Sequence, residues 1–124
     1  MVNYSVTIKS ASKELTARER IMMKDTGNAI KFDDVATDDS HFVFKPVAYV
    51  VLSVHNEKAS DGKDYEQYVI LSEDGYKYVT GSRSFWDAFM SIWSEMDGES
   101  FELEVYKKDS KNYKGKKFLS CSIV

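Results

Sequence analysis

The chain has 124 residues, is 43% hydrophobic and carries a formal net charge of −3 at pH 7. This length and composition predict one compact domain, residues 1–124, with a hydrophobic core of its own. We expect no membrane-spanning segment, because no run of about 18 apolar residues occurs, and no secretory leader, because residues 1–10 alternate in polarity.

Few side chains suit a disulfide or a metal site. Cys121 is the only cysteine, so no disulfide can form within the chain, which fits a reducing cytoplasm. One cysteine and two histidines, His41 and His55, are too few for the usual structural zinc site. We therefore expect no metal, no other cofactor and a cytoplasmic location.

The first 40 residues predict a strand, an ambiguous segment and a turn. Residues 3–10 alternate in polarity, which is typical of a strand. In residues 15–25, Thr16 and Glu19 have the spacing of a helical capping box. The same residues also alternate in polarity, and a strand is favoured because the rest of the chain is rich in strands. Residues 31–40 are acidic and predict a turn.

The middle of the chain predicts three further strands. Residues 41–57 form the longest extended run, in which Pro46 predicts a bulge or a sheet edge. Alternation places Val50 and Leu52 on one face of this strand and Tyr49 and His55 on the other. Residues 64–82 predict two strands joined at the turn Glu73-Asp74-Gly75, which is a hairpin signal.

Residues 84–97 predict the helix of the domain. Ser84 is placed to cap its start, and Gly98 is placed to end it. Apolar side chains, including Phe85, Trp86 and Phe89, share one side of this helix, so we interpret them as core residues.

Two strands follow the helix, at residues 100–108 and 117–124, each with an apolar and a polar face. Several strands, a helix between the third and fourth strands of a barrel, and two final strands make the order of an OB-fold. We therefore predict a mostly β protein with one helix, built as an OB-fold-like five-stranded barrel. Such barrels bind oligonucleotides or oligosaccharides on a sheet face and its flanking loops. A small α+β domain of another kind is the alternative.

Catalysis has no candidate residues. The sequence contains no glycine-rich phosphate loop, nucleophile elbow or HExxH motif. The trio His55-Asn56-Glu57 is interpreted as a strand end that turns into a loop, because three successive strand residues do not converge on one point, and His41 has no candidate partner. Cys121 lies on an apolar strand face and is interpreted as a small buried residue. The acidic pairs Asp33/Asp34 and Asp38/Asp39 lack the spacing of a calcium loop and are interpreted as solvated turn residues. We expect a protein that is not an enzyme.

Residues 106–124 are basic in an otherwise acidic chain. They hold six lysines and one aspartate, a net charge of +5, whereas residues 1–105 hold 11 basic and 19 acidic side chains, a net charge of −8. Such segregation creates a local positive surface even when the total charge is negative. The alternative is a lysine-rich hairpin that is only solvated.

Aromatic residues are interleaved with these lysines, which favours binding to single-stranded nucleic acid. Exposed rings stack on bases, each worth about 1–3 kcal/mol, while lysines contact phosphates. The stacking candidates are Tyr106, Tyr113 and Phe118. The candidate phosphate contacts are Lys107, Lys108, Lys111, Lys114, Lys116 and Lys117. Further candidates, placed by alternation opposite the core residues, are Tyr49, His55, Tyr76 and Tyr78. The alternative is that the tyrosines are ordinary strand residues.

Four blocks of the sequence carry a family resemblance. They are ELTARERIMMKDTGNAIKFDDV, PVAYVVLSVHNEK, YVILSEDGYKYVTGSRSFWDAFMSIW and SKNYKGKKFLSCSIV. Through them, most of the chain resembles the small single-stranded-DNA-binding proteins encoded by tailed phages and mobile elements of Gram-positive bacteria. The segment SKNYKGKKF is also similar to the turn before the last strand in more distant phage relatives.

The resemblance implies an OB-fold protein that coats and protects single-stranded DNA intermediates of replication or transfer in a bacterial host, with little sequence preference. Replication proteins are further expected partners. The resemblance is also compatible with an oligomer. Bacterial housekeeping relatives end in an acidic tail that recruits partners, whereas this chain ends in a predicted strand, so recruitment through such a tail is not expected. The alternative function is a phage or mobile-element protein-interaction module that inhibits or recruits a host protein, which the acidic residues 33–40 would suit.

Overall fold

The computed structural model describes residues 4–37, 41–56, 64–109 and 117–124, which form eight strands and three α-helices. The strands are β1 (Tyr4–Ala11), β2 (Ile30–Lys31), β3 (Phe42–Phe44), β4 (Pro46–Asn56), β5 (Asp64–Ser72), β6 (Lys77–Thr80), β7 (Leu103–Asp109) and β8 (Lys117–Ile123). The helices are α1 (Ala17–Lys24), α2 (Phe32–Val35) and α3 (Arg83–Met96), and a 3₁₀ turn spans Thr26–Asn28. The mostly β composition is confirmed, but the prediction of a single helix is wrong.

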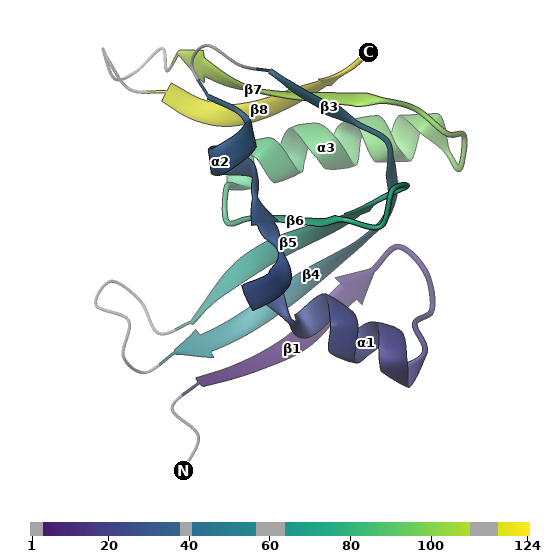
Figure 1. The fold of residues 1–124 in the computed structure, drawn as a ribbon, viewed down its shortest axis with the longest axis vertical. Coiled ribbons are helices and arrows are strands. Elements are labelled where there is room, and N and C mark those ends of the chain that lie inside the picture. Colours follow the sequence, from purple (N-terminus) through teal and green to yellow (C-terminus); the bar gives the residue numbers. More distant parts are fainter. Residues whose placement is uncertain (1–3, 38–40, 57–63, 110–116) are drawn as a thin grey trace.

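The strands form two open sheets with α3 between them (Figure 1). The five-stranded sheet has the order β1-β4-β5-β6-β2, and the three-stranded sheet has the order β3-β7-β8. Every pair is antiparallel except β2 with β6. Within the described part of the chain, neither sheet closes into a barrel.

The centre of the five-stranded sheet is buried on both faces. On one face, Val50 and Leu52 of β4 pack in a cluster with Met23 of α1. On the other face, Tyr49 and Val51 belong to the larger core that includes α3. Because each face has its own apolar layer, the residues of β4 read as a nearly continuous apolar run.

Helix α3 carries the predicted apolar side, with Phe85 and Phe89 fully buried. It begins one residue earlier than predicted, because the Ser82 hydroxyl accepts a hydrogen bond from the Phe85 N–H (3.2 Å). The prediction that Ser84 caps the helix is therefore wrong. Its hydroxyl instead donates to the Leu119 carbonyl (3.2 Å) and so links α3 to β8. Gly98 follows the helix with φ of +89°, a conformation that favours glycine.

Residues 15–25, for which a strand was favoured, form α1. The Thr16 hydroxyl accepts a hydrogen bond from the Glu19 N–H (3.2 Å), and the Glu19 carboxylate accepts one from the Thr16 N–H (3.1 Å). This capping box holds the pKa of Glu19 below its usual value. At the other end, the Lys77 ammonium donates to the carbonyls of Met22 (2.6 Å) and Asp25 (2.9 Å). Hydrogen bonds at both ends therefore fix a helix where alternation favoured a strand.

Two predicted bends are confirmed and one segment differs. The pairing of β4 with β5 shifts register between Pro46 and Ala48, as expected of a bulge. Gly75 adopts φ of +93° in the turn that joins β5 to β6. The segment predicted as an acidic turn, residues 31–40, instead contains α2, whose Phe32 is fully buried, and its residues 38–40 lie outside the described residues.

Candidate nucleic-acid interface

The three-stranded sheet has a buried face and an outer face. Leu103 and Val105 of β7 and Leu119 and Cys121 of β8 are buried in the core with α3, as alternation predicted. The opposite side chains form the outer face, which comprises Glu104, Tyr106, Lys108, Phe118, Ser120 and Ser122. Lys108 lies opposite Phe118 in the ladder, and Tyr106 lies opposite Ser120. Two aromatic rings and a lysine therefore come from adjacent rungs of one face.

Both the hydroxyl and the ring of Tyr106 contact neighbouring side chains, which orients the ring. Its hydroxyl forms a hydrogen bond with the Ser122 hydroxyl (2.6 Å). Its ring lies beside the His41 ring, with 5.4 Å between the centroids, and His41 Nδ1 lies 2.7 Å from the Glu104 carboxylate. An oriented ring loses less conformational freedom when a ligand stacks on it.

His41 was missed by sequence reasoning, which gave it no partner. Residue 41 comes directly before β3, and the pairing of Phe42 with Val105 brings it beside Tyr106. This pairing joins strands that are far apart in the sequence, so only the fold reveals it. The prediction that His41 stands alone is wrong.

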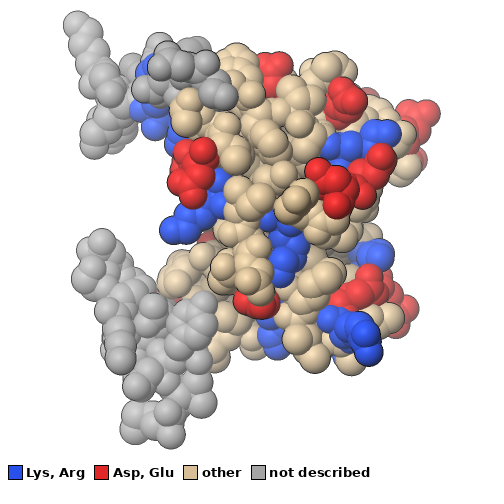
Figure 2. All heavy atoms as spheres, in the orientation of Figure 1, with Lys and Arg blue, Asp and Glu red and all other residues tan. Residues whose placement is uncertain are grey.

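The predicted lysines divide between surfaces. Lys108 and Lys117 are exposed where β7 ends and β8 begins, whereas Lys107 points to the other side of β7 from Lys108 and forms an ion pair with Asp33 of α2. Figure 2 shows Lys and Arg atoms gathered at upper left, where β7 ends and β8 begins in Figure 1. The predicted site residues that lie outside the described residues are Lys111, Tyr113, Lys114 and Lys116.

One of the further candidates, Tyr78, is buried, so its predicted placement on an exposed sheet face is wrong, and a second, Tyr49, is half-buried against the core. The ring of Tyr49 lies nearly perpendicular to the rings of Trp86 and Trp93, with centroids 5.2 and 5.3 Å away. Tyr78 is 4% exposed and stacks on Phe32 at 5.3 Å. Burial raises the pKa of the Tyr78 hydroxyl, as expected of a phenol away from water.

The other two further candidates belong to the β4–β6 part of the chain and not to the outer face of β7 and β8. Tyr76 is exposed in the turn between β5 and β6. His55 lies near the end of β4, where its Nδ1 is 2.7 Å from the Asp64 carboxylate. Of the nine predicted site residues that the structure describes, the fold brings Tyr106, Lys108 and Phe118 onto one face.

Other chemistry has little support in the described residues. No cluster of three or more His, Cys, Asp or Glu side chains that could hold a metal ion occurs in the part of the chain that the structure describes. Cys121 is buried, and this raises the pKa of its thiol to about 12, so the thiol stays protonated at neutral pH. Among the helices of the described ranges, none is both long and apolar enough to span a bilayer.

Comparisons of the chain with protein-family models, with curated proteins and with solved structures found no match.

Proposed function

We propose that this chain is a single-stranded DNA-binding protein, without enzymatic activity, that coats and protects single-stranded intermediates with little sequence preference. The observation that supports this most directly is the outer face. Tyr106 and Phe118 are large and only half-buried, yet neither belongs to either core cluster of the protein. Two aromatic rings that the core does not use, beside the exposed Lys108, make a stacking platform with a charged edge.

Binding in this proposal combines stacking and charge. Bases stack on the rings of Tyr106 and Phe118, and because every base has a π-face, this contact discriminates little between sequences. Lys108 contacts phosphates and releases counterions, so affinity falls as salt rises. The ring of His41 extends the platform on the β3 side of Tyr106.

We infer that the fold is an open OB-like arrangement. Only Lys45 separates β3 from β4, so the two count as one bent strand that pairs with β7 through β3 and with β5 through β4. The resulting order is β8-β7-β3/β4-β5-β6, with α3 between the third and fourth strands, which is the OB connectivity. The additional strand β1 pairs with β4.

The site proposed for this chain differs from the usual OB surface, which centres on the second and third strands. Here those strands are β5 and β6, and their Val69 and Val79 are buried in one cluster with Met23 of α1. Since the sheet face beneath α1 is covered, we assign binding to the outer face of β7 and β8. A role in replication or transfer of a phage or mobile element follows from the sequence resemblance.

The experiment is a fluorescence-anisotropy titration of a short unstructured DNA oligonucleotide at several salt concentrations. The test variant Tyr106→Ala with Phe118→Ala removes both rings, and Tyr65→Ala, which removes an exposed tyrosine of β5, is the matched control. We expect the double variant to bind at least about fivefold more weakly and the control to bind like the wild type. Wild-type protein that does not bind at low salt would overturn the function, and an unaffected double variant would overturn the site.

A further inference from the structure

Helix α1 presents an apolar and basic surface to solvent. Ile21 is 72% exposed and Met22 is 41% exposed, which is unusual for large apolar side chains. Arg18 lies three and four residues before them and Lys24 lies three residues after Ile21, so all four share the outward side of the helix. Met23 faces the core and Lys77 binds the last carbonyls of α1, which holds this surface in a fixed position.

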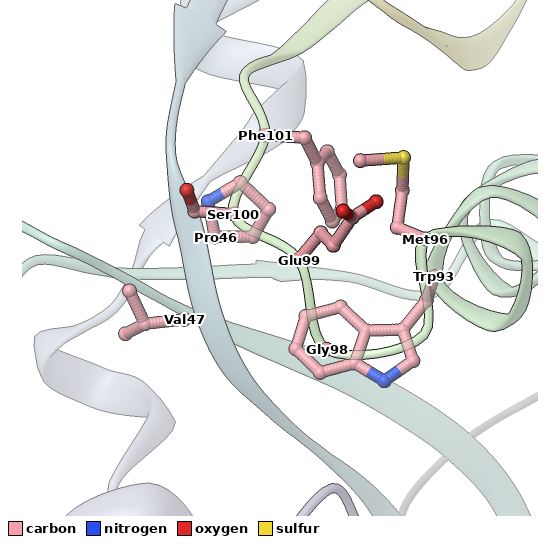
Figure 3. Close-up of a pocket in the computed structure, with 8 residues that line it drawn as sticks. All are labelled: Pro46, Val47, Trp93, Met96, Gly98, Glu99, Ser100 and Phe101. Atoms are coloured by element: carbon pink, nitrogen blue, oxygen red, sulfur yellow. The ribbon is translucent and has the colours of Figure 1, made fainter.

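An apolar cavity of about 270 Å³ lies beside the C-terminal end of α3. Its walls come from α3, from the segment after it and from the bend between β3 and β4. Figure 3 shows them: Trp93, Met96, Phe101, Pro46, Val47 and Glu99. Val47 is 46% exposed although it is a strand residue, because the bulge turns it out of the ladder. The cavity is large enough for aliphatic side chains and has few polar groups to hold water.

The surroundings of this cavity are acidic. Residues 84–106 contain six acidic side chains and neither lysine nor arginine. Glu95, Asp97, Glu99 and Glu102 lie on the last turn of α3 and the segment after it, and within the described residues none of them forms an ion pair. The negative end of the α3 dipole adds to this charge. The nearest basic residue in sequence to the cavity wall, Lys45, is already paired with Glu73 (3.2 Å).

These two surfaces complement each other in polarity and charge. We propose that α1 of one copy of this chain docks into the cavity at the end of α3 of a second copy. Ile21 and Met22 enter the cavity, and Arg18 and Lys24 face the carboxylates around it. The two surfaces do not overlap, since no residue of α1 lines the cavity, and α1 lies apart from the end of α3 in Figure 1. The contact is therefore head to tail and leaves one free surface at each end, which builds open chains of copies.

This association goes beyond the proposed function and does not depend on it, so it is tested without DNA. Sedimentation velocity over a range of protein and salt concentrations measures the size of the wild-type protein. We expect growth beyond a dimer as concentration rises, and weaker association as salt screens the charges.

Two variants each remove one partner surface. Ile21→Ser with Met22→Ser removes the apolar part of α1, and Val47→Lys places a positive charge at the cavity. Both changes are at exposed positions, and urea unfolding verifies that each variant is folded. Glu99→Lys, also exposed, replaces Val47→Lys if that protein does not fold. Tyr65→Ser, an exposed position on β5, is the control.

We expect each variant alone to associate at least about tenfold more weakly than the wild type and the control to associate normally. A mixture of the two variants retains one intact helix and one intact cavity, so it should form a 1:1 dimer and stop there. A monomeric wild type, a variant that associates as well as the wild type, or a mixture that does not form the dimer would overturn the proposal.

Discussion

Lys107 of β7 forms an ion pair with Asp33 of α2, and this contact turns its ammonium away from the outer face that carries Lys108. The Lys107 side chain is 21% exposed, whereas Lys108 is exposed to solvent. Because side chains alternate along a strand, two adjacent lysines serve different surfaces. One joins β7 to α2, and the other is open to a ligand.

Lys108→Ala should therefore weaken binding to single-stranded DNA more than Lys107→Ala. A lost phosphate contact weakens binding to all sequences alike and lowers the slope of log affinity against log salt by about 1. Lys107→Ala removes the partner of Asp33, so it should lower the urea midpoint and leave the salt slope unchanged. Anisotropy titrations at several salt concentrations measure both slopes, and Lys13→Ala, which removes a lysine before α1, controls for net charge. Equal slopes for Lys107→Ala and Lys108→Ala would contradict this division.

Replacing Tyr106 by leucine should weaken DNA binding, whereas replacing Tyr78 by leucine should lower the stability of the fold. Tyr106→Leu removes a ring from the outer face and should cost about 1–3 kcal/mol of binding free energy, with little change in stability. Tyr78→Leu breaks the stack on Phe32 and should lower the free energy of unfolding by about 0.5–1.5 kcal/mol or more, with little change in affinity. Anisotropy and urea unfolding of both variants measure the two quantities. A stable Tyr78→Leu protein that has lost binding would place Tyr78 in the site.

Local sequence patterns predicted the secondary structure correctly where a single pattern applied to a segment. Alternation gave the buried and outer sides of β7 and β8, and the Gly75 turn gave the hairpin. In residues 15–25, alternation and the capping box made opposite predictions, and the hydrogen bonds of Thr16 and Glu19 formed the helix. Polarity alone could not decide this case, because Ile21 and Met22 are exposed where a globular helix usually buries its apolar residues.

Which face of a strand is covered depends on contacts that are distant in the sequence. Alternation correctly separates Tyr49 from Val50, but it does not reveal that α3 covers the first and α1 the second. For the same reason Tyr78 was placed on an exposed face, and His41 was left without its neighbour Tyr106. The part of the site that was predicted, Tyr106 with Lys108 and Phe118, lies on two strands adjacent in the sequence.

Thr16→Ala should destabilise α1 more than Thr16→Ser. The alanine removes the hydroxyl that accepts from the Glu19 N–H and should cost about 1 kcal/mol, whereas serine keeps the hydroxyl and the capping box. Urea unfolding measures the difference between the two variants. If α1 is the docking helix, Thr16→Ala should also weaken self-association in sedimentation velocity. Equal stability of both variants would show that the cap contributes nothing to the fold.

The buried thiol of Cys121 should make the protein less stable at alkaline pH. Its pKa is about 12 in the folded protein and about 8.5 in an unfolded chain. The stabilisation is therefore complete below about pH 8.5, and it is lost as pH rises toward 12, because only the unfolded state releases the thiol proton. In this range the thiol alone makes the free energy of unfolding fall by up to about 1.4 kcal/mol per pH unit.

The variant Cys121→Ala has no thiol to titrate and should lose stability less steeply with rising pH than the wild type. Tyr68 and Tyr78, whose pKa values burial also raises, add the same alkaline decline to both proteins, so the difference between the two curves isolates the thiol. Urea unfolding at a series of pH values from neutral upward provides these curves, and Ser120→Ala, at a neighbouring outer-face residue without a titrating group in this range, should follow the wild type. Parallel curves for wild type and Cys121→Ala would mean that the thiol is not protected from water in the folded state.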